Sequence, residues 1–379
     1  MPELLVEDYK TKLYSENFDW SLDCDNEKLC MIFSFSSSYS GEEAPTVAIE
    51  IIAPDGETLY YSHSYTVGKC DEVTTNEWRI PPVVFKNAKC HIHFTIPEGT
   101  QLNITDYRIR YADYYKPTSP DLKFNAHLGF YGVAPENTIP AFELAGLCGF
   151  DSCITVPKIT KDGVFVCIHD DTINKRARDH RGNVPEEEMS VSDMTYEELL
   201  NWDFGMWKNS AYKNTKIPTL DEFFKICHDY NMKPFFSIHP NFTDKEWQQV
   251  RKMLIDYDLL DKFQVKSRRI DVLESVFRVF GNEINCYTLW SKEYNDDLIH
   301  KLSSLNLDLS KVRGVIEILE KLDTKNFNEE IVEKIKTAGF TPSALCCWGR
   351  KTGEYYRRLI SLGVNEFTED YHCSFGLNW

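Results

Sequence analysis

The feature that most constrains this chain is a regular alternation that runs from residue 122 to residue 368. Short apolar runs alternate there with stretches whose apolar residues recur at helical spacing. The apolar runs predict eight strands, at 122–127, 151–156, 234–239, 263–267, 283–288, 311–317, 343–348 and 364–368. Helices are predicted between them, for example from Leu220 to His228 and from Glu329 to Ala338, where Gly339 suits a helix end. Eight such units in about 260 residues fit a closed (β/α)₈ barrel better than an open parallel sheet.

The first part of the chain has a different pattern, of strands joined by turns. Val47, Ile49 and Ile51 alternate with polar residues, and the same alternation returns between Cys90 and Ile96. We therefore predict an all-β, jelly-roll-like sandwich over residues 1–115, a linker at 116–121 and the barrel over 122–379.

Two groups of side chains in the predicted sandwich each allow two interpretations. The aromatic residues are either core or stacking platforms of a carbohydrate-binding-like domain, and core is the more frequent use. They are Trp20, Tyr60, Tyr61, Tyr65 and Trp78. His91 and His93 share one strand face, and a solvent-facing pair is favoured over a metal site because the sequence shows no third ligand.

Composition argues against several classes of partner. A net charge of −17 disfavours nucleic acid and anionic membranes, which are bound mainly through clustered Lys and Arg. No segment has the ~18 apolar residues of a membrane span, and the stretch from Met1 to Asp8 lacks the features of a signal peptide. We expect a cytoplasmic protein whose cysteines are reduced and packed. Oligomeric state is not indicated by the sequence.

Two histidines are predicted at the carboxyl-terminal rim of the barrel, where proteins of this architecture have their functional sites. His127 ends the first predicted strand, and His169 closes the apolar run that begins at Val164.

The motifs around these histidines resemble the glycerophosphodiester phosphodiesterase family, whose signature includes H-R-G, P-E-N-T-x-x-A-F, T-K-D-G, H-D-x-T and I-P-T-L. The corresponding residues here are His127 and Gly129, Pro135 to Thr138, Ala141 and Phe142, Gly149 and Asp151, Thr160 to Gly163, His169 to Thr172, and Ile217 to Leu220. The resemblance covers about 122–379. It implies two histidines as general acid and base, an arginine on the phosphate, and a divalent cation held by three carboxylates.

The residues that would hold this cation are missing. The resemblance places two of the three carboxylates on Ile154 and Val156 and the third on Ser237. The lysine that follows the third carboxylate falls on His239, and the arginine of H-R-G falls on Leu128. Because aliphatic side chains cannot bind a cation, we predict no metal site of the family's kind and no other cofactor.

The surviving histidines leave three interpretations open. The first is a metal-independent phosphodiesterase, in which His127 and His169 transfer protons while a substrate hydroxyl attacks its own phosphodiester to give a cyclic phosphate. The second is a non-catalytic protein that binds a sugar or polyol in the old pocket. The third is a different enzyme, such as a lyase or hydrolase of a glycan. We favour the first, with a small-molecule or glycan phosphodiester as substrate.

Without the metal, a side-chain cation must face the phosphate. Lys158 and Arg350 are the candidates, and bacterial phosphatidylinositol phospholipases, which resemble this barrel, use an arginine where other enzymes use a metal. The rest of the predicted substrate-binding set is Glu136, Asn137, Ser237, His239 and Trp348. Glu136 either orients a histidine or complements a helix dipole. Asp170 and Asp171 either orient His169 or cap the following turn.

Overall fold

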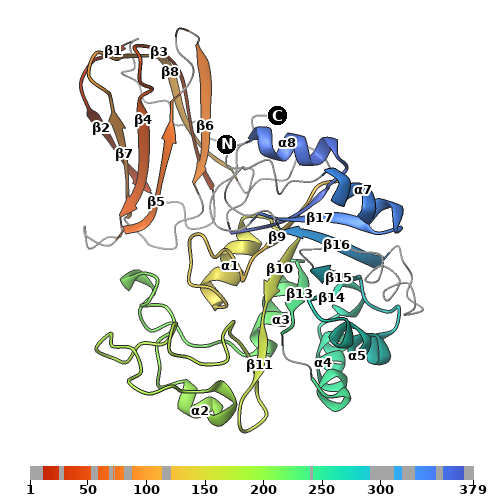
Figure 1. The fold of residues 1–379 in the computed structure, drawn as a ribbon. Helices are drawn as coiled ribbons and strands as arrows, with labels where there is room; N and C mark the ends of the chain where they lie inside the picture. Colours follow the sequence, from red (N-terminus) through yellow and green to blue (C-terminus); the bar gives the residue numbers. More distant parts are fainter. Residues whose placement is uncertain are drawn as a thin grey trace. The chain divides into compact units, whose positions relative to one another are not determined.

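A computed structural model describes residues 12–24, 30–52, 59–67, 71, 73–80, 88–112, 121–239, 242–290, 311–317, 329–346 and 353–370. The chain divides into two compact units, one formed mainly by Met1–Lys116 and the other by Pro117–Lys208 and Tyr212–Cys373 (Figure 1). Among the helices in these ranges, none has both the length and the apolar character needed to cross a membrane.

The first unit is an all-β sandwich with jelly-roll connectivity, as predicted. Its strands are β1 (Lys12–Tyr14), β2 (Phe18–Cys24), β3 (Cys30–Ser40), β4 (Thr46–Ile52), β5 (Leu59–Thr66), β6 (Thr74–Ile80), β7 (Ala88–Thr95) and β8 (Gln101–Ala112). They pair antiparallel as nested hairpins, β1 with β8, β2 with β7, β3 with β6 and β4 with β5. Further pairing of β3 with β8 and of β4 with β7 gives the sheets β1-β8-β3-β6 and β2-β7-β4-β5.

Alternating side chains form the core between these sheets. Val47, Ile49 and Ile51 are fully buried, which is the period-two pattern of a half-buried strand. Trp20 of β2 lies edge-on to Phe33 of β3, with ring centroids 5.9 Å apart, so aromatic packing joins the two sheets. This supports the core interpretation for Trp20. The side chains of the other four aromatic residues named above lie outside what the structure describes.

His91 and His93 lie on the outer side of β7, because the alternate residues of this strand are buried. Nδ1 of His93 lies 2.5 Å from Oδ1 of Asp19, and its Nε2 lies 3.3 Å from Glu50. Both histidines are partly exposed, and His93 is held by two neighbouring carboxylates.

The second unit is a closed barrel of eight parallel strands, which confirms the predicted fold. The strands are β9 (Lys123–Ala126), β10 (Ser152–Thr155), β13 (Lys233–Ser237), β14 (Gln264–Ser267), β15 (Cys286–Trp290), β16 (Val312–Glu317), β17 (Thr341–Cys346) and β18 (Glu366–Glu369). Each overlaps one of the eight predicted strands. The barrel closes where β18 pairs with β9, with Glu369 opposite Ala126.

Helices follow most of these strands and surround the barrel (Figure 1). They are α1 (Ile139–Leu147), α3 (Leu220–Asp229), α4 (Asp244–Asp256), α5 (Ile270–Phe280), α7 (Glu329–Thr337) and α8 (Gly353–Ser361). The start of α3 is fixed by a capping box, in which Thr219 accepts from the backbone N–H of Glu222 and the Glu222 carboxylate accepts from that of Thr219. Both helices predicted from their pattern, near 220–228 and 329–338, are therefore present.

The turn after β9 passes very close to α1. Gly129 has a φ of 82°, and a Cβ at this position would lie 2.6 Å from Cβ of Ala141. Glycine is required here for both its conformation and its lack of a side chain. The turn therefore fixes the backbone that follows His127.

The barrel interior is partly polar. The side-chain amide of Asn125 donates to Oε1 of Glu366 at 3.0 Å, and Nε of Arg313 donates to Oε2 at 3.0 Å. Opposite charges are thus paired inside the barrel, which limits the cost of burying them.

A hairpin interrupts the strand–helix alternation after β10. Strands β11 (Pro157–Ile159) and β12 (Phe165–Cys167) pair antiparallel and lie outside the barrel sheet. The backbone N–H of Ile168 then donates to the carbonyl of Val156 at 3.0 Å, so the chain returns to the end of β10. His169 therefore reaches the rim from a hairpin rather than from a barrel strand.

Candidate active site

His127 follows β9, and its ring is held by the residue that follows β18. Nδ1 of His127 lies 2.8 Å from Oδ1 of Asp370, and the two side chains are 17% and 4% exposed. The backbone N–H of His127 also donates to the carbonyl of Glu369 at 2.8 Å. The contact at Nδ1 leaves Nε2 as the nitrogen that can act on a ligand.

His169 has a similar carboxylate partner, supplied by its neighbour in sequence. Nδ1 of His169 lies 3.0 Å from Oδ1 of Asp170, and Lys175 lies 3.4 Å from the other carboxylate oxygen. Partial burial opposes ionisation of Asp170, but the hydrogen bond with His169 and the nearby positive charges lower the pKa of this carboxyl. This contact is the one that the predicted orienting role of Asp170 requires.

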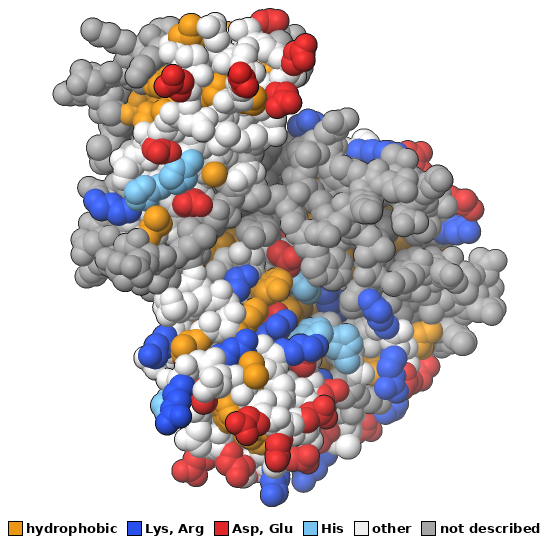
Figure 2. Space-filling view, turned by 60° about the vertical axis from the view of Figure 1, so that its left-hand side comes forward, with side chains coloured by type: hydrophobic (Ala, Val, Ile, Leu, Met, Phe, Trp, Pro, Cys, Tyr) orange, Lys and Arg blue, Asp and Glu red, His pale blue; other side chains and the backbone are white. Residues whose placement is uncertain are grey.

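Positive charge gathers around His239. The ring centroids of His239 and His169 lie 5.5 Å apart. The pKa of His239 is lowered to about 4, mainly because the ring is partly buried. Nearby positive charges lower it further, those of His169, Lys158, Lys266 and Arg268. On one face of the barrel unit, Figure 2 shows histidine side chains beside Lys or Arg side chains and hydrophobic side chains. Positively charged side chains are thus concentrated around His239, although the chain as a whole is acidic.

Lys158, the predicted substitute for the metal, is buried and already has a partner. It lies in β11, opposite Val166, and its ammonium forms an ion pair with Asp171. Its positive charge is therefore shared with a carboxylate, which weakens its effect on a bound anion.

Lys266 is a second buried cation that the sequence did not reveal. It is 3% exposed and lies in β14 directly opposite Ser237 of β13, the position where the family's third carboxylate would fall. Its ammonium lies 5.8 Å from the ring centroid of Phe235. Paired residues of parallel strands point to the same side of the sheet, so Lys266 and Ser237 face the barrel interior together.

Two of the three positions where the resemblance places metal ligands have apolar surroundings. Ile154 and Val156 form one buried apolar cluster with Leu128 and Phe235. In the parts of the chain that the structure describes, no group of three or more His, Cys, Asp or Glu side chains could hold a metal ion. Divalent cations such as Mg²⁺ and Ca²⁺ bind oxygen ligands, and this cluster offers none.

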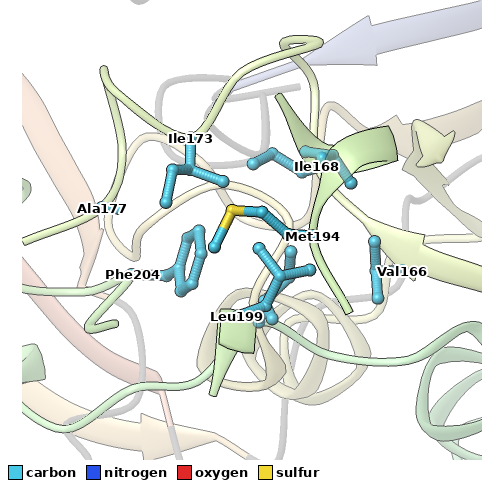
Figure 3. Packing of buried hydrophobic residues seen from close by; sticks show 9 residues of the cluster. Val166, Ile168, Ile173, Ala177, Met194, Leu199 and Phe204 are labelled. Carbon is cyan, nitrogen blue, oxygen red and sulfur yellow. The ribbon is translucent and has the colours of Figure 1, made fainter. Parts of the chain in front are cut away.

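Residues 172–216 form a long segment that packs on its own hydrophobic core (Figure 3). The core joins this segment to β12 and comprises Val166, Ile168, Ile173, Ala177, Val191, Met194, Leu199, Phe204 and Ile217. The segment contains only short helices, α2 (Tyr196–Leu199) and the 3₁₀ turns Val191–Asp193 and Ser210–Tyr212. Another 3₁₀ turn, Leu260–Lys262, precedes β14. The segment therefore has a fixed place beside the histidines despite its scarcity of regular structure.

One residue of this segment pairs with the predicted site residue Glu136. Nε of Arg176 lies 3.0 Å from Oε1 of Glu136, and its NH2 group donates to Oε2 at 3.1 Å. The guanidinium also stacks over the ring of Trp207, 4.2 Å from its centroid. Glu136 is thus held in an ion pair with Arg176.

Asn137, also predicted at the site, is buried, and only the oxygen of its side-chain amide has hydrogen-bond partners among the described residues. Its Oδ1 accepts from the hydroxyl of Thr155 at 2.9 Å and from the backbone N–H of Val156 at 3.3 Å. Its Nδ2 has no hydrogen-bond partner within the described part of the chain. A buried donor without a partner is costly, and a ligand can satisfy it.

Tyr131 and Lys208 lie beside His127. The ring centroids of Tyr131 and His127 are 6.4 Å apart, and the ammonium of Lys208 lies 4.4 Å above the Tyr131 ring. Burial lowers the pKa of Lys208, although the charges of Asp370 and Glu136 oppose this shift.

Two predicted site residues, Trp348 and Arg350, lie outside the described residues. Burial disfavours the reactive thiolate form of two thiols near the site. Cys153 and Cys167 are buried, and desolvation raises the pKa of both, to about 12 for Cys167.

Comparison with known sequences places most of the chain in one family. A model described as the glycerophosphoryl diester phosphodiesterase family matches residues 127–371. A putative glycerophosphodiester phosphodiesterase of Bacillus subtilis is 40% identical over 103 residues, which are 27% of this chain and 39% of that protein. A glycerophosphodiester phosphodiesterase of Bacillus altitudinis is 38% identical over a match that covers 144 residues, 35% of this chain and 54% of that protein. The matched segments thus span only about two fifths to one half of these relatives.

Solved structures show the same fold. A phosphodiesterase of Oleispira antarctica in complex with the product sn-glycerol-3-phosphate has a TM-score of 0.55 and 21% identity, over 67% of this chain and 94% of its own. A glycerophosphodiester phosphodiesterase of Agrobacterium tumefaciens has a TM-score of 0.52 and 17% identity, over 67% and 98% of the two chains.

Proposed function

This chain belongs to the glycerophosphoryl diester phosphodiesterase family, and we propose that it cleaves a glycerophosphodiester, or a related polyol or sugar phosphodiester, without the divalent cation of that family. The observation that carries this proposal is that both histidines are held at Nδ1 by a carboxylate, His127 by Asp370 and His169 by Asp170. Such contacts fix the orientation of an imidazole and stabilise its protonated form, which are the requirements of a general acid and base.

The proposed reaction is an attack by a substrate hydroxyl on the phosphorus of its own diester. One histidine accepts the hydroxyl proton, while the other donates a proton to the oxygen of the departing alcohol. A new P–O bond forms a cyclic phosphate as the bond to the leaving group breaks. Water can then open the ring with the two histidines in exchanged roles. His127 and His169 must therefore start the reaction in opposite protonation states.

Negative charge on the phosphoryl oxygens has to be offset when no metal is bound. The cations around His239, which are Lys158, Lys266 and Arg268, supply positive charge at this rim. We propose that His239 and Ser237, together with the predicted residues Trp348 and Arg350, contact the substrate. Glu136 instead acts through Arg176, which it holds.

The relative from Oleispira antarctica supports the choice of substrate class, since it was solved with sn-glycerol-3-phosphate. A phosphorylated polyol of this size has the hydroxyl that the proposed attack requires. The family match favours such a substrate over a glycan reaction without phosphate.

One observation favours a second candidate, a non-catalytic protein that binds a phosphorylated polyol. The positions of the lost metal ligands are filled by the apolar cluster of Leu128, Ile154, Val156 and Phe235. Losing the metal removes a large share of the electrostatic stabilisation of the transition state. The two candidates predict the same ligand and differ only in turnover.

Phosphorus NMR with sn-glycero-3-phosphocholine as substrate tests the proposal. The wild type is expected to release choline and to show the signal of a cyclic phosphate before glycerophosphate. His127→Ala and His169→Ala should each reduce the rate by about 100-fold or more, because a positioned acid or base contributes about this factor. Binding of the diester with no cleavage, whether Mg²⁺ and Ca²⁺ are present or absent, would favour the non-catalytic candidate.

A further inference from the structure

The ion pair of Arg176 and Glu136 joins the two parts of the chain that follow the histidines. Glu136 lies in the turn between His127 and the start of α1, and Arg176 lies in the segment 172–216, shortly after His169. The two contacts between their side chains measure 3.0 and 3.1 Å, and these side chains are 24% and 4% exposed. Because the pair is largely buried and makes two contacts, it fixes both distance and direction between the two parts.

On its arginine side, the pair leads to the carboxylate that orients His169. Lys175, the residue before Arg176, has its ammonium 3.4 Å from Asp170, and Asp170 contacts Nδ1 of His169. Burial opposes the positive charge of Arg176, but Glu136 and Asp170 are among the groups that raise its pKa. The guanidinium therefore interacts with the carboxylates of both parts.

On its glutamate side, the pair leads to the carboxylate that orients His127. The backbone N–H of Gly132, in the same turn as Glu136, donates to the carbonyl of Asp370 at 2.9 Å, and the Asp370 side chain contacts Nδ1 of His127. The next backbone N–H after Glu136 donates to the carbonyl of Leu128 at 2.9 Å, which closes the turn. Glu136 thus belongs to a closed turn that is tied to the His127 partner.

The segment holds Arg176 from behind. The backbone N–H of Arg176 donates to the carbonyl of Ile173 at 3.0 Å, and its guanidinium stacks over the ring of Trp207. Nε1 of Trp207 donates to the carbonyl of Phe204 at 2.9 Å. Ile173 and Phe204 both belong to the buried core of the segment, so Arg176 is connected to the body of the segment and not to a free end.

Two other side chains of the segment contact the same turn. Nζ of Lys208 donates to the carbonyl of Tyr131 at 2.7 Å, and the hydroxyl of Tyr212 donates to that of Val133 at 3.3 Å. Both of these contacts end on the backbone, whereas the ion pair joins two side chains. The ion pair is therefore the contact that substitutions can remove from both sides.

We propose that Arg176 and Glu136 are positioning residues, whose ion pair holds the two histidine–carboxylate pairs at the separation that proton transfer to and from one phosphodiester requires. General acid and base must both lie within hydrogen-bond reach of the same substrate, and a small displacement lowers the rate steeply. This inference rests on the proposed function for the reaction, but the surroundings of the imidazoles can be measured without turnover.

Removing both charges separates a positioning role from a merely structural one. Arg176→Met alone leaves the buried carboxylate of Glu136 without its cation and should lower the melting temperature. Arg176→Met combined with Glu136→Gln should recover most of that loss, because no uncompensated charge remains. In this double variant kcat should stay about tenfold or more below that of the wild type, while KM changes by less than about twofold. A kcat that recovers together with the melting temperature would overturn the inference.

Arg176→Lys is a second, conservative variant. It keeps a positive charge beside Glu136 but cannot make the two-point contact of a guanidinium. Its melting temperature should stay near that of the wild type, and its kcat should lie between those of the wild type and the double variant. A kcat as low as that of the double variant would still support positioning by the two-point contact, whereas a kcat equal to that of the wild type would show that charge alone suffices and would overturn the inference.

Two-dimensional NMR of the imidazoles distinguishes failure of this inference from failure of the proposed function. The signals of both His127 and His169 should shift in the double variant. The matched control is Arg251→Met with Glu283→Gln, which removes another bidentate pair, at α4, and should leave these signals and kcat unchanged. Shifts of both histidines in a protein that cleaves no diester would refute the catalytic proposal alone. Wild-type signals of both histidines in the double variant would overturn the positioning role.

Discussion

The imidazole of His127 is held by the carboxylate of Asp370 at 2.8 Å, across the seam where β18 meets β9. The two residues are separated by 243 positions in the chain, and only closure of the barrel brings them together. The candidate catalytic histidine is thus oriented by the same strand pairing that completes the fold.

Asp370→Asn should lower kcat strongly and change KM little. The amide occupies nearly the same volume as the carboxylate, but it cannot stabilise a protonated imidazole and can favour the wrong tautomer. We expect a loss of about 100-fold or more, by analogy with other histidines held by a carboxylate. Steady-state kinetics in EDTA would measure it. A kcat within a factor of two of the wild type would argue against His127 as a proton-transfer group.

Asp170→Asn should cost less than Asp370→Asn. The His169 side chain is 43% exposed, whereas that of His127 is 17% exposed, so water can partly replace the lost contact at His169. The same kinetic measurement on both variants gives the comparison. Equal losses would show that solvent does not compensate at either histidine.

His239 should titrate near pH 4, well below the ordinary histidine value of 6.5. Two-dimensional NMR of the imidazole can follow this titration in a protein with labelled histidines. Lys266→Met removes one of the cations that disfavour protonation, so the pKa of His239 should rise in that variant. An unchanged pKa would mean that Lys266 does not act on the site electrostatically.

The same shift makes stability depend on pH. Between about pH 4 and 6.5 the unfolded chain holds a proton on His239 that the folded protein lacks. Stability should therefore fall as pH drops through this window, and no effect of this group is expected above it. His239→Gln should make the melting temperature, measured by circular dichroism, less dependent on pH over this range. An equally steep dependence in the variant would assign it to other groups.

Arg313→Met should destabilise the barrel by about 3 kcal/mol, because it leaves the buried carboxylate of Glu366 without its cation. Urea unfolding would measure the loss. The double variant Arg313→Met with Glu366→Gln should lose less than the sum of the single changes, since no uncompensated charge then remains. Additive losses would contradict an interaction between the two side chains.

The strands of the barrel could be predicted because each one is an apolar run between helical patterns. His127 and His169 could be predicted because local motifs surround them. Asp370 was not among the predicted site residues. Its position was a usable signal, because a residue directly after the last strand of a closed barrel lies beside the first strand. Lys266 carries no motif, and only the register with Ser237 reveals its place. The pairing of Arg176 with Glu136 depends on a long segment whose course no periodicity indicates.

The claim that the barrel works without a divalent cation is tested most directly by initial rates of phosphodiester cleavage during titration with EDTA, Mg²⁺ and Ca²⁺. We predict that metal-free protein cleaves the diester at an unchanged rate, that added cations do not accelerate it, and that His127→Ala is inactive under every condition. A rate that disappears in EDTA and returns with Mg²⁺ or Ca²⁺ would contradict this account.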